Sequence, residues 1–504
     1  MFDRLARFLP ATVLGGLLLV LGPVGCDGLF ADLSDLDTAS GACDDDADSF
    51  GGGDGTAADP FRICTRSHFN DIGDDPSLMD AHFALHSDID FDERIFTPIG
   101  SPQHPDMDLD ENSGENNAPF NGTFDGNGHT IRGPHISTLD LSIGLFRHLG
   151  PDGEIFDLTV EDLVVSGSLL VGGLVGLNEG EISDCTIGGN SRLEVHGNAG
   201  ALGGLVMGGL VAQNLDGGGI SNCTAAVDVT GLSLIGGLVG IHQGVLITQS
   251  EASGEVITEG ELTASALDDL SDDDSGAAAI AGGLVGVNES WILDSLATGD
   301  VTSNNEITIA EGGSGGEMVG GLVGANVDNG QIDLSIARGE VTASSELDVS
   351  MVGTDSSTSA GGFSGSNSGR IEDCYATGRV RIPDAYDNSL SIGGGLVGSI
   401  VPVPNSTAPQ ITNCYSTGPV STPQSSVRGG LIGLRFPESD PPAVTNSYWD
   451  VDTSVLPDSD GGTGLDTDEF AEQGIFDEDW DFDSDWQMRE DHEGNLRPHL
   501  FWDQ

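Results

Sequence analysis

The sequence predicts an all-β protein, a right-handed parallel β-helix (a solenoid) with a cap at its N-terminal and its C-terminal end. Two observations lead to this prediction. A Gly-rich unit recurs eight times at intervals of 28 to 46 residues. Each unit also contains short β-prone segments separated by Gly, Asn and Asp turns, without the i, i+3, i+4, i+7 apolar spacing of a long helix. The 76 glycines and the 6% aromatic content of the 504-residue chain fit such short strands.

Each repeat opens with two glycines, then Leu or Phe, then a small or branched residue. The eight copies begin at Gly172, Gly208, Gly236, Gly282, Gly320, Gly361, Gly394 and Gly429. Most copies continue with Ile-x-(Asp/Asn)-(Cys/Ser), and later with Gly-x-Val. The variable spacing disfavours a closed propeller, whereas a solenoid accommodates extra residues as external loops. We therefore expect one unit per coil, with the segments 258–281, 302–319 and 342–360 as loops that could contact partners.

Equivalent residues of successive coils should stack in columns, because paired strands lie about 4.8 Å apart. One internal column is expected at Leu174, Leu210, Leu238, Leu284, Leu322, Phe363, Leu396 and Leu431. A second is expected at Ile182, Ile220, Ile292, Ile332, Ile371 and Ile411. The paired glycines permit tight turns and close approach of coils. Recurrent Asn is expected in a turn where it tolerates the left-handed conformation, at Asn178, Asn214, Asn288, Asn326 and Asn367.

The cysteines are expected to play two different roles. Cys185 should lie beside Cys223, and Cys374 beside Cys414, as free buried thiols in one column. Cys43 and Cys64 flank a Gly/Asp-rich stretch and are the candidate disulfide pair, since export to an oxidising compartment permits disulfides.

The N-terminal segment has the three-part layout of a secretory signal. Residues 1–25 comprise a short basic region with Arg4 and Arg7, an apolar run, and small residues before Cys26. The junction with Cys26 resembles a bacterial lipoprotein lipobox, although Pro23 stands where Leu is usual. The resemblance implies lipidation of Cys26 and attachment to a membrane through that lipid. The alternative is an ordinary signal peptide that leaves Cys26 as an unpaired thiol.

The charge excludes one class of partner. The chain has 82 acidic residues against 16 basic ones, all Arg, and a formal net charge of −66. Such a chain repels phosphates, so nucleic acid is not expected as a partner. The acidic residues spread along the whole chain, which indicates a solvated surface suited to high salt or to divalent cations. Codon bias in a GC-rich genome would equally explain the absence of Lys.

The residues offer no catalytic constellation and no metal site that we would assign. His82 and His86 have the spacing of a zinc HExxH motif, but Phe83 replaces the glutamate that would act as the base. The densest basic cluster is expected to balance the acidic surface rather than to catalyse, and it consists of Arg370, Arg379 and Arg381.

Calcium is a candidate cofactor on weaker grounds. Alternating Asp residues in 44–48, 106–110 and 477–485 resemble the start of a calcium loop, but none has both the central Gly and the terminal Glu of an EF-hand. A solvated acidic face is the alternative. In 477–485 and Trp486 the aromatic residues are expected to pack on the last coil and to leave the Asp residues outside.

The Gly-Gly-Leu-Val-Gly units resemble the GLUG motif, which is named for its Gly-Leu-Val/Ile-Gly core. The segment 120–131 looks like the stretch that commonly precedes GLUG arrays, and 446–450 and 461–465 look like their usual end. The resemblance covers about residues 60–500. GLUG repeats occur in bacterial surface adhesins and in the non-catalytic part of some immunoglobulin A peptidases. The resemblance therefore implies a β-helix on the cell surface with an adhesive role.

The expected organisation places a signal at 1–25 and an acidic tether at 26–59. An N-terminal cap with entry coils at 60–142, the repeat β-helix at 143–450 and an acidic C-terminal cap at 451–504 follow. The leading hypothesis is an exported, lipid-anchored protein of the cell envelope that binds a surface glycan or protein without catalysis. One alternative is a carbohydrate-active β-helix enzyme, a polysaccharide lyase or glycoside hydrolase. The other is a structural envelope protein.

Overall fold

The computed structural model divides the chain into residues 1–41 and a compact unit of residues 42–504. It describes residue 43 and residues 50–503, apart from gaps at 101–117, 139, 196–205, 264–276, 309–313, 328, 349–354, 384–389, 404–406, 424–425, 437–442, 477–478 and 493. The expected signal at 1–25 and Cys26 therefore lie outside the described residues.

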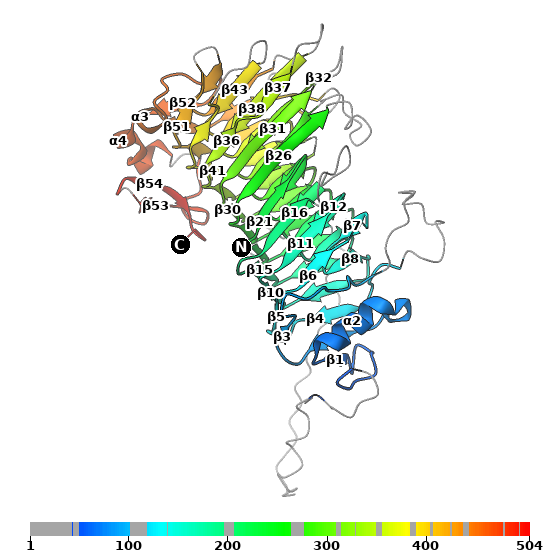
Figure 1. Ribbon diagram of the computed structural model, residues 1–504. Helices are drawn as coiled ribbons and strands as arrows, with labels where there is room; N and C mark the ends of the chain where they lie inside the picture. Colours follow the sequence, from blue (N-terminus) through cyan, green and yellow to red (C-terminus); the bar gives the residue numbers. More distant parts are fainter. Residues whose placement is uncertain are drawn as a thin grey trace, which may run out of the picture. The chain divides into compact units, whose positions relative to one another are not determined.

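The described unit is a parallel β-helix in which each full coil contributes one strand to each of five sheets (Figure 1). We name these sheets A to E in the order in which the chain passes through them. Sheet A consists of β1 (Phe61–Ile63), β2 (Phe83–Leu85), β4 (Thr123–Asp125), β9 (Glu154–Phe156), β14 (Glu181–Ser183), β19 (Gly219–Ser221), β24 (Leu246–Thr248), β29 (Trp291–Leu293), β34 (Gln331–Asp333), β40 (Arg370–Glu372), β45 (Gln410–Thr412) and β50 (Ala443–Thr445). Sheet B consists of β3 (Ile89–Asp90), β5 (Thr130–Arg132), β10 (Thr159–Glu161), β15 (Thr186–Gly188), β20 (Thr224–Ala225), β25 (Glu251–Ala252), β30 (Leu296–Ala297), β35 (Ile336–Ala337), β41 (Tyr375–Ala376), β46 (Tyr415–Ser416), β51 (Tyr448–Asp450) and β52 (Thr463–Leu465).

The other three sheets complete each coil. Sheet C consists of β6 (His135–Ser137), β11 (Val164–Gly167), β16 (Arg192–Val195), β21 (Asp228–Gly231), β26 (Val256–Thr263), β31 (Val301–Thr308), β36 (Val341–Ala343), β37 (Glu346–Asp348), β42 (Val380–Arg381) and β47 (Val420–Ser421). Sheet D consists of β7 (Ser142–Ile143), β12 (Leu170–Gly172), β17 (Val206–Gly208), β22 (Leu234–Gly236), β27 (Ala277–Gly282), β32 (Ser314–Gly320), β38 (Asp355–Gly361), β43 (Leu390–Gly394) and β48 (Val427–Gly429). Sheet E consists of β8 (Phe146–Leu149), β13 (Val175–Asn178), β18 (Val211–Asn214), β23 (Val239–His242), β28 (Val285–Asn288), β33 (Val323–Asn326), β39 (Ser364–Asn367), β44 (Val397–Ile400) and β49 (Ile432–Arg435).

This architecture confirms the predicted all-β parallel β-helix. The parallel ladder already starts at β1, within the segment expected to form the cap and entry coils, and continues to β52, beyond residue 450. Within the described residues, no helix has the length and apolar character that a membrane span requires.

The two expected apolar columns fill the interior. Every member of the Leu/Phe column is 0–1% exposed, and backbone hydrogen bonds of 2.8 to 2.9 Å, such as Leu174 N to Leu210 O, join each member to the next coil. The Ile column is equally buried, and strand register pairs Ile182 with Ile220 and Ile332 with Ile371. Ile155 and Ile247 extend this second column into coils where the sequence motif is weaker.

The paired glycines mark the corner between sheets D and E, where neighbouring coils come closest. A Cβ on Gly321 would lie 2.1 Å from the carbonyl oxygen of Gly362 in the next coil, and the equivalent distances from Gly173 to Gly395 are 2.0 to 2.2 Å. A Cβ on the first glycine of a pair would lie 1.8 to 2.0 Å from the carbonyl oxygen three residues on. None of these paired glycines has a positive φ. Close backbone approach, rather than a left-handed turn, therefore excludes other residues here.

The left-handed conformation lies at a different position from the one expected. The residue before each Cys or Ser of the repeat, at the corner between sheets A and B, has a φ of 48° to 54°, as in Asp184, Asn222 and Asn413. The following small side chain donates to the carbonyl two residues back and accepts from the backbone N–H of the previous coil. Ser295, for example, donates to Leu293 O at 2.9 Å and accepts from Ser250 N at 3.4 Å. Cys and Ser interchange here because both are small donors.

The recurrent Asn residues instead form a buried ladder at the ends of the sheet E strands. Asn178 donates to Asn214 at 2.6 Å, and Asn288 donates to Asn326 at 2.8 Å. These side chains are fully buried, so the amide ladder satisfies polar groups that could not reach water. His242 takes the Asn position in one coil: its Nδ1 lies 3.0 Å from Asn214 Nδ2 and its Nε2 lies 3.1 Å from Trp291 O.

Each end of the β-helix is covered. At the N-terminal end, helix α2 (Arg66–Asp74) is followed by the 3-10 turn η1 (Pro76–Leu78), and α2 places Phe69 against Phe96 and Phe124 with ring centroids 5.2 Å apart. At the C-terminal end, Gly430 N donates to Asp458 O and Ile432 N donates to Ser459 Oγ. These contacts occupy backbone groups of the last coil that would otherwise form an open sheet edge.

The chain then leaves the last coil and folds back over sheet B. This C-terminal segment contains α3 (Val451–Ser454), α4 (Thr467–Phe470), the 3-10 turn η3 (Gln473–Ile475) and the antiparallel pair β53 (Trp486–Glu490) and β54 (Leu496–Leu500).

The glycine contact yields a first prediction. Gly321→Ala should lower the free energy of unfolding by at least about 2 kcal/mol, because the new methyl group can be placed only by separating two coils. The matched control is Gly474→Ala, where an added Cβ meets no atom within 4 Å. We expect the control to change stability by less than about 0.5 kcal/mol in urea unfolding. Equal effects of the two substitutions would contradict the proposed role of the corner.

A second prediction concerns acid. Burial lowers the pKa of His242 to about 4 from 6.5. Since the unfolded chain takes up a proton near pH 6.5 and the folded chain does not until pH 4, stability should fall as pH falls through this window. His242→Asn would restore the amide ladder and remove the titrating group. Between pH 7.5 and 4.5 we expect the wild type to lose about 2 to 3 kcal/mol more than this variant in urea unfolding. If the stability of the wild type and of His242→Asn changed in parallel with pH, the prediction would be contradicted.

Candidate functional site

Three adjacent long coils build a projection that we call the wing. The wing comprises β26, β31 and β37 of sheet C, and β27, β32 and β38 of sheet D. Strands β26 and β31 pair along eight residues, and β32 and β38 along seven, whereas most other strands of these sheets have two to five residues. The expectation that 258–281, 302–319 and 342–360 are loops is therefore wrong for most of their described residues, which form strands. The extra residues lengthen the strands of sheets C and D (Figure 1), and strands of the two sheets contact each other there.

Side-chain alternation along β31 shows how the wing is built. Val301, Ser303, Asn305 and Ile307 are buried, and the residues between them are partly or fully exposed. Only Val301 and Ile307 of the four buried residues are apolar, so the sequence of this stretch lacks the apolar and polar alternation that would have predicted a long paired strand. The exposed side of β31 carries Asn304, Glu306 and Thr308, so the wing offers a polar, acidic outer face.

A cluster of carboxylates lies elsewhere, at the corner between sheets A and B. One oxygen each from Asp333, Glu372 and Asp373 lies within 4.8 Å of the others. Arg370 donates to Glu372 from the same strand, β40. Asp373 Oδ1 also accepts from Asn413 Nδ2 and from Trp486 Nε1, both at 3.1 Å. The cluster has the donor set for a divalent cation, and it also fastens the C-terminal segment to the coils.

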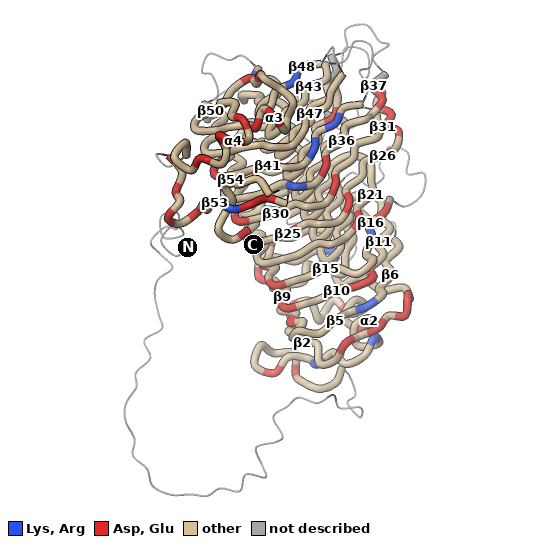
Figure 2. Tube along the Cα trace, turned by 90° about the vertical axis from the view of Figure 1, so that its left-hand side faces the viewer, with Lys and Arg blue, Asp and Glu red and all other residues tan. Residues whose placement is uncertain are grey.

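The structure separates the three arginines of the basic cluster. Arg370 belongs to the carboxylate cluster, whereas Arg379 lies 3.9 Å from Glu340 with half of its side chain exposed. Arg381 is exposed at the end of β42. Figure 2 shows acidic positions recurring over successive coils with the few arginines among them.

Among the described residues, neither the histidine pair nor the calcium-like segments form a metal site with one another. His82 and His86 flank the three-residue strand β2, so they do not lie one turn apart on a helix. The segments 44–48 and 106–110 lie outside the described residues. In the third segment Asp479, Asp481 and Asp483 are exposed, but Asp485 is buried.

The aromatic residues of that segment pack over the flank of the helix rather than on the last coil alone. Trp480 and Trp486 are at most 3% exposed. Ring centroids place Trp486 within 6.1 to 6.2 Å of Tyr375 and Tyr415, and Trp480 6.0 Å from Tyr448. These tyrosines occupy one outward column of sheet B in three successive coils. The column was readable in the sequence as Tyr at a fixed repeat position. The sequence indicated that the aromatic residues of 477–486 cover the last coil, but not that they reach as far as Tyr375.

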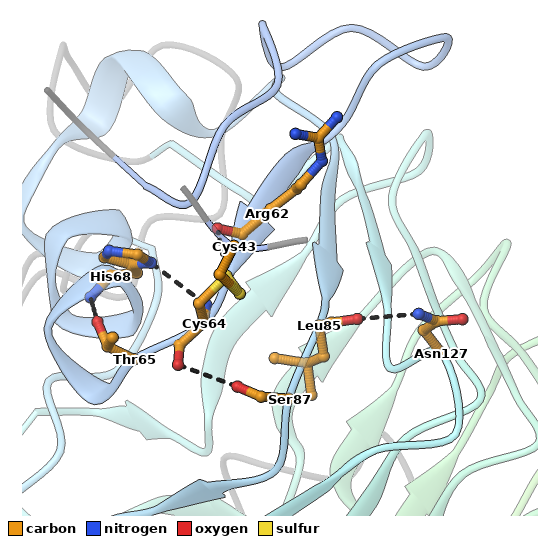
Figure 3. Close-up of a disulfide and its surroundings, with 8 residues drawn as sticks. All are labelled: Cys43, Arg62, Cys64, Thr65, His68, Leu85, Ser87 and Asn127. Carbon is orange, nitrogen blue, oxygen red and sulfur yellow. Dashed lines mark hydrogen bonds between the residues drawn. A yellow bond between two sulfur atoms is a disulfide. The ribbon is translucent and has the colours of Figure 1, made fainter. Parts of the chain in front are cut away.

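Cys43 and Cys64 form a disulfide in the N-terminal cap (Figure 3). Around it, Cys64 N donates to His68 Nδ1 at 3.2 Å, and Ser87 Oγ donates to Cys64 O at 2.9 Å. The bond therefore ties residue 43 to β1 and the start of α2. The other four described cysteines, Cys185, Cys223, Cys374 and Cys414, are free and buried.

One comparison with known proteins matches the repeat motif. Residues 356–381 match the family model of the GLUG motif. The chain is 29% identical over 147 residues to halomucin of Haloquadratum walsbyi, which covers 27% of this chain and 2% of that protein. It is 34% identical over 147 residues to a protein described as a Gly-rich membrane protein of Evansella cellulosilytica, covering 28% of this chain and 16% of that protein. The chain thus spans a small part of the length of these relatives.

Among solved structures, the chain is similar to a protein described as an immunoglobulin A1 protease from Bacteroides ovatus. The TM-score is 0.31 at 17% identity, over 90% of this chain and 96% of that one. A second structure, named IgA1 protease, gives a TM-score of 0.29 at 16% identity, over 76% of this chain and 21% of that one. Likeness at these TM-scores carries no argument about activity. The chain contains a GLUG motif within a repeat whose copies form successive coils of a β-helix.

The disulfide yields a third prediction. Replacing both Cys43 and Cys64 by Ser should lower the free energy of unfolding by about 3 kcal/mol, because the bond closes a loop across 21 residues of the unfolded chain. Thermal unfolding with and without reductant measures this. Reductant should lower the unfolding temperature of the wild type and leave the double variant unchanged; equal shifts in both would show that the bond does not stabilise the cap.

Proposed function

We propose that this chain is an exported protein of the cell surface, held to a membrane by a lipid on Cys26, that acts by binding or display rather than by catalysis. Its partner would be a surface glycan or a protein. The observation that carries the proposal is the wing. Here the extra residues of three repeat units form paired strands that project from the β-helix. Binding residues concentrate on such projections from a rigid scaffold.

The relatives support the same class of function. One is named halomucin and the other is described as a membrane protein, and both names fit a protein of the cell envelope. The net charge of −66 keeps a protein soluble outside the cell at high salt.

A second candidate, a polysaccharide-cleaving enzyme, is favoured by the carboxylate cluster with Arg370. Enzymes of this kind need a base beside metal-bound or paired carboxylates, and the cluster brings Asp333, Glu372 and Arg370 together on one flank. However, Asp373 is 3% exposed and already holds the indole of Trp486, which leaves little access for a sugar chain.

The test compares the wild type with a variant that lacks the wing. The segments 259–279, 304–317 and 344–358 would each be replaced by the short turn Leu232–Ser233, which joins the same two sheets in the preceding coil. Both proteins are assayed against a panel of surface glycans and whole cells for binding and for new chain ends. We expect the variant to lose binding at least about tenfold while it keeps the β-helix.

The matched control shortens a different corner. Replacing 401–409 by the turn Glu179–Gly180 removes residues between sheets E and A and should leave binding unchanged. Binding that survives removal of the wing would contradict the proposal. Cleavage of a glycan that Glu372→Gln abolishes would establish the enzyme instead, and a folded protein that binds nothing in the panel or on cells would favour a structural role in the envelope.

A further inference from the structure

A buried acidic side chain without a basic partner lies between the two layers of the wing. Glu317 on β32 is 1% exposed, and its Oε2 accepts a hydrogen bond of 2.5 Å from Ser345 Oγ. Burial raises the pKa of this carboxyl, while hydrogen bonds from hydroxyl groups oppose the shift. The largest influences on this pKa are burial and the hydrogen bonds from Ser303, Ser345 and Thr358, and none of these is the charge of an Arg or His.

Glu317 belongs to a group of oxygen-bearing side chains that we call the hydroxyl cluster. Its members are Thr258, Ser303, Asn305, Glu317, Ser345 and Thr358, all at most 3% exposed. They come from β26, β31, β32, β38 and the turn before β37, so the cluster joins three coils and both layers of the wing.

The hydroxyl hydrogens are largely used within this cluster. Thr258 Oγ1 donates to Ser303 Oγ at 2.9 Å and accepts from Asn305 Nδ2 at 2.8 Å. Ser345 Oγ accepts from Asn305 N at 2.9 Å, lies 3.0 Å from Ser303 Oγ, and donates to Glu317. Two buried atoms are left without any partner, Glu317 Oε1 and Asn305 Oδ1. Both are acceptors, so the cluster lacks positive charge or donors rather than acceptors.

We propose that the hydroxyl cluster is an internal site for a monovalent cation, Na⁺ or K⁺, held by the Glu317 carboxylate and the side-chain oxygen of Asn305. The hydroxyl oxygens of Ser303, Ser345 and Thr358 also lie against Glu317, and oxygen atoms are the ligands that hard cations prefer. One carboxylate balances one positive charge, whereas a divalent ion would leave an uncompensated charge in a buried place. The bound ion would tie sheet C to sheet D inside the wing, and this holds whether or not the wing binds a partner.

The experiment measures the unfolding temperature of the full chain at constant ionic strength in choline, sodium and potassium chloride, with a separate addition of calcium chloride. Constant ionic strength removes general screening as a cause. We expect sodium or potassium to raise the unfolding temperature of the wild type by about 2 to 5 °C over choline, as binding to the folded state alone requires. Glu317→Gln should lose this difference.

The matched control is Glu306→Gln, which removes the same charge from the exposed side of β31 and should keep the full cation response. If Glu317→Gln fails to fold, crystals of the wild type soaked in thallium(I) should show anomalous density beside Glu317. A Glu317→Gln variant as stable as the wild type in every salt would overturn the proposal and indicate a protonated, neutral carboxyl. An equal response to choline, or a response to calcium alone, would overturn it as well.

Discussion

The rest of the structure depends on the backbone contact at the corner between sheets D and E. The second glycine of each pair lies so near the next coil that a Cβ would come within 2.0 to 2.2 Å of a carbonyl oxygen, from Gly173 to Gly395. Only a hydrogen fits, so every coil must have the same shape at this point. The strands that enter and leave the corner therefore keep one register, and this stacks the Leu/Phe and Ile columns.

A second fixed corner leaves few places where a coil can grow. At the turn from sheet A to sheet B, a left-handed residue and a small donor at the next position satisfy the backbone in every repeat coil, as Asp294 and Ser295 do. Residues inserted at either corner would disrupt the backbone contacts and hydrogen bonds that join neighbouring coils there. Most of the variation in coil length is instead found between sheets C and D, with smaller insertions between sheets E and A. The wing follows from these constraints, because three neighbouring coils that grow at the same corner can pair their additional strands.

The fold could be predicted from the sequence because the same residues restrict the backbone in every repeat unit. The Gly pairs, the Leu/Phe and Ile positions and the irregular spacing were enough to predict a β-helix with one unit per coil. The role of the Asn column was predicted incorrectly: Asn178 and its equivalents bond to one another, and Asp184 and its equivalents take the left-handed turn. Asn is common in both settings, and only the register between coils distinguishes them. The cover over Tyr375 and Tyr415 is a long-range contact with Trp486, which no local pattern encodes.

The wing differs from the coils in what holds it together. A coil lies between two others and shares continuous apolar columns, whereas the wing spans three coils and has a small apolar part, with Leu262 and Ile307 toward its tip. A two-layered sheet of this width buries little apolar surface, so polar contacts must supply much of its stability. Those contacts converge on Glu317, whose unpaired charge would weaken the layer it joins. If the wing is the part of the molecule that binds a partner, its rigidity depends on what balances the negative charge of Glu317. The cation concentration of the surrounding solution would then determine how well ordered the binding surface is.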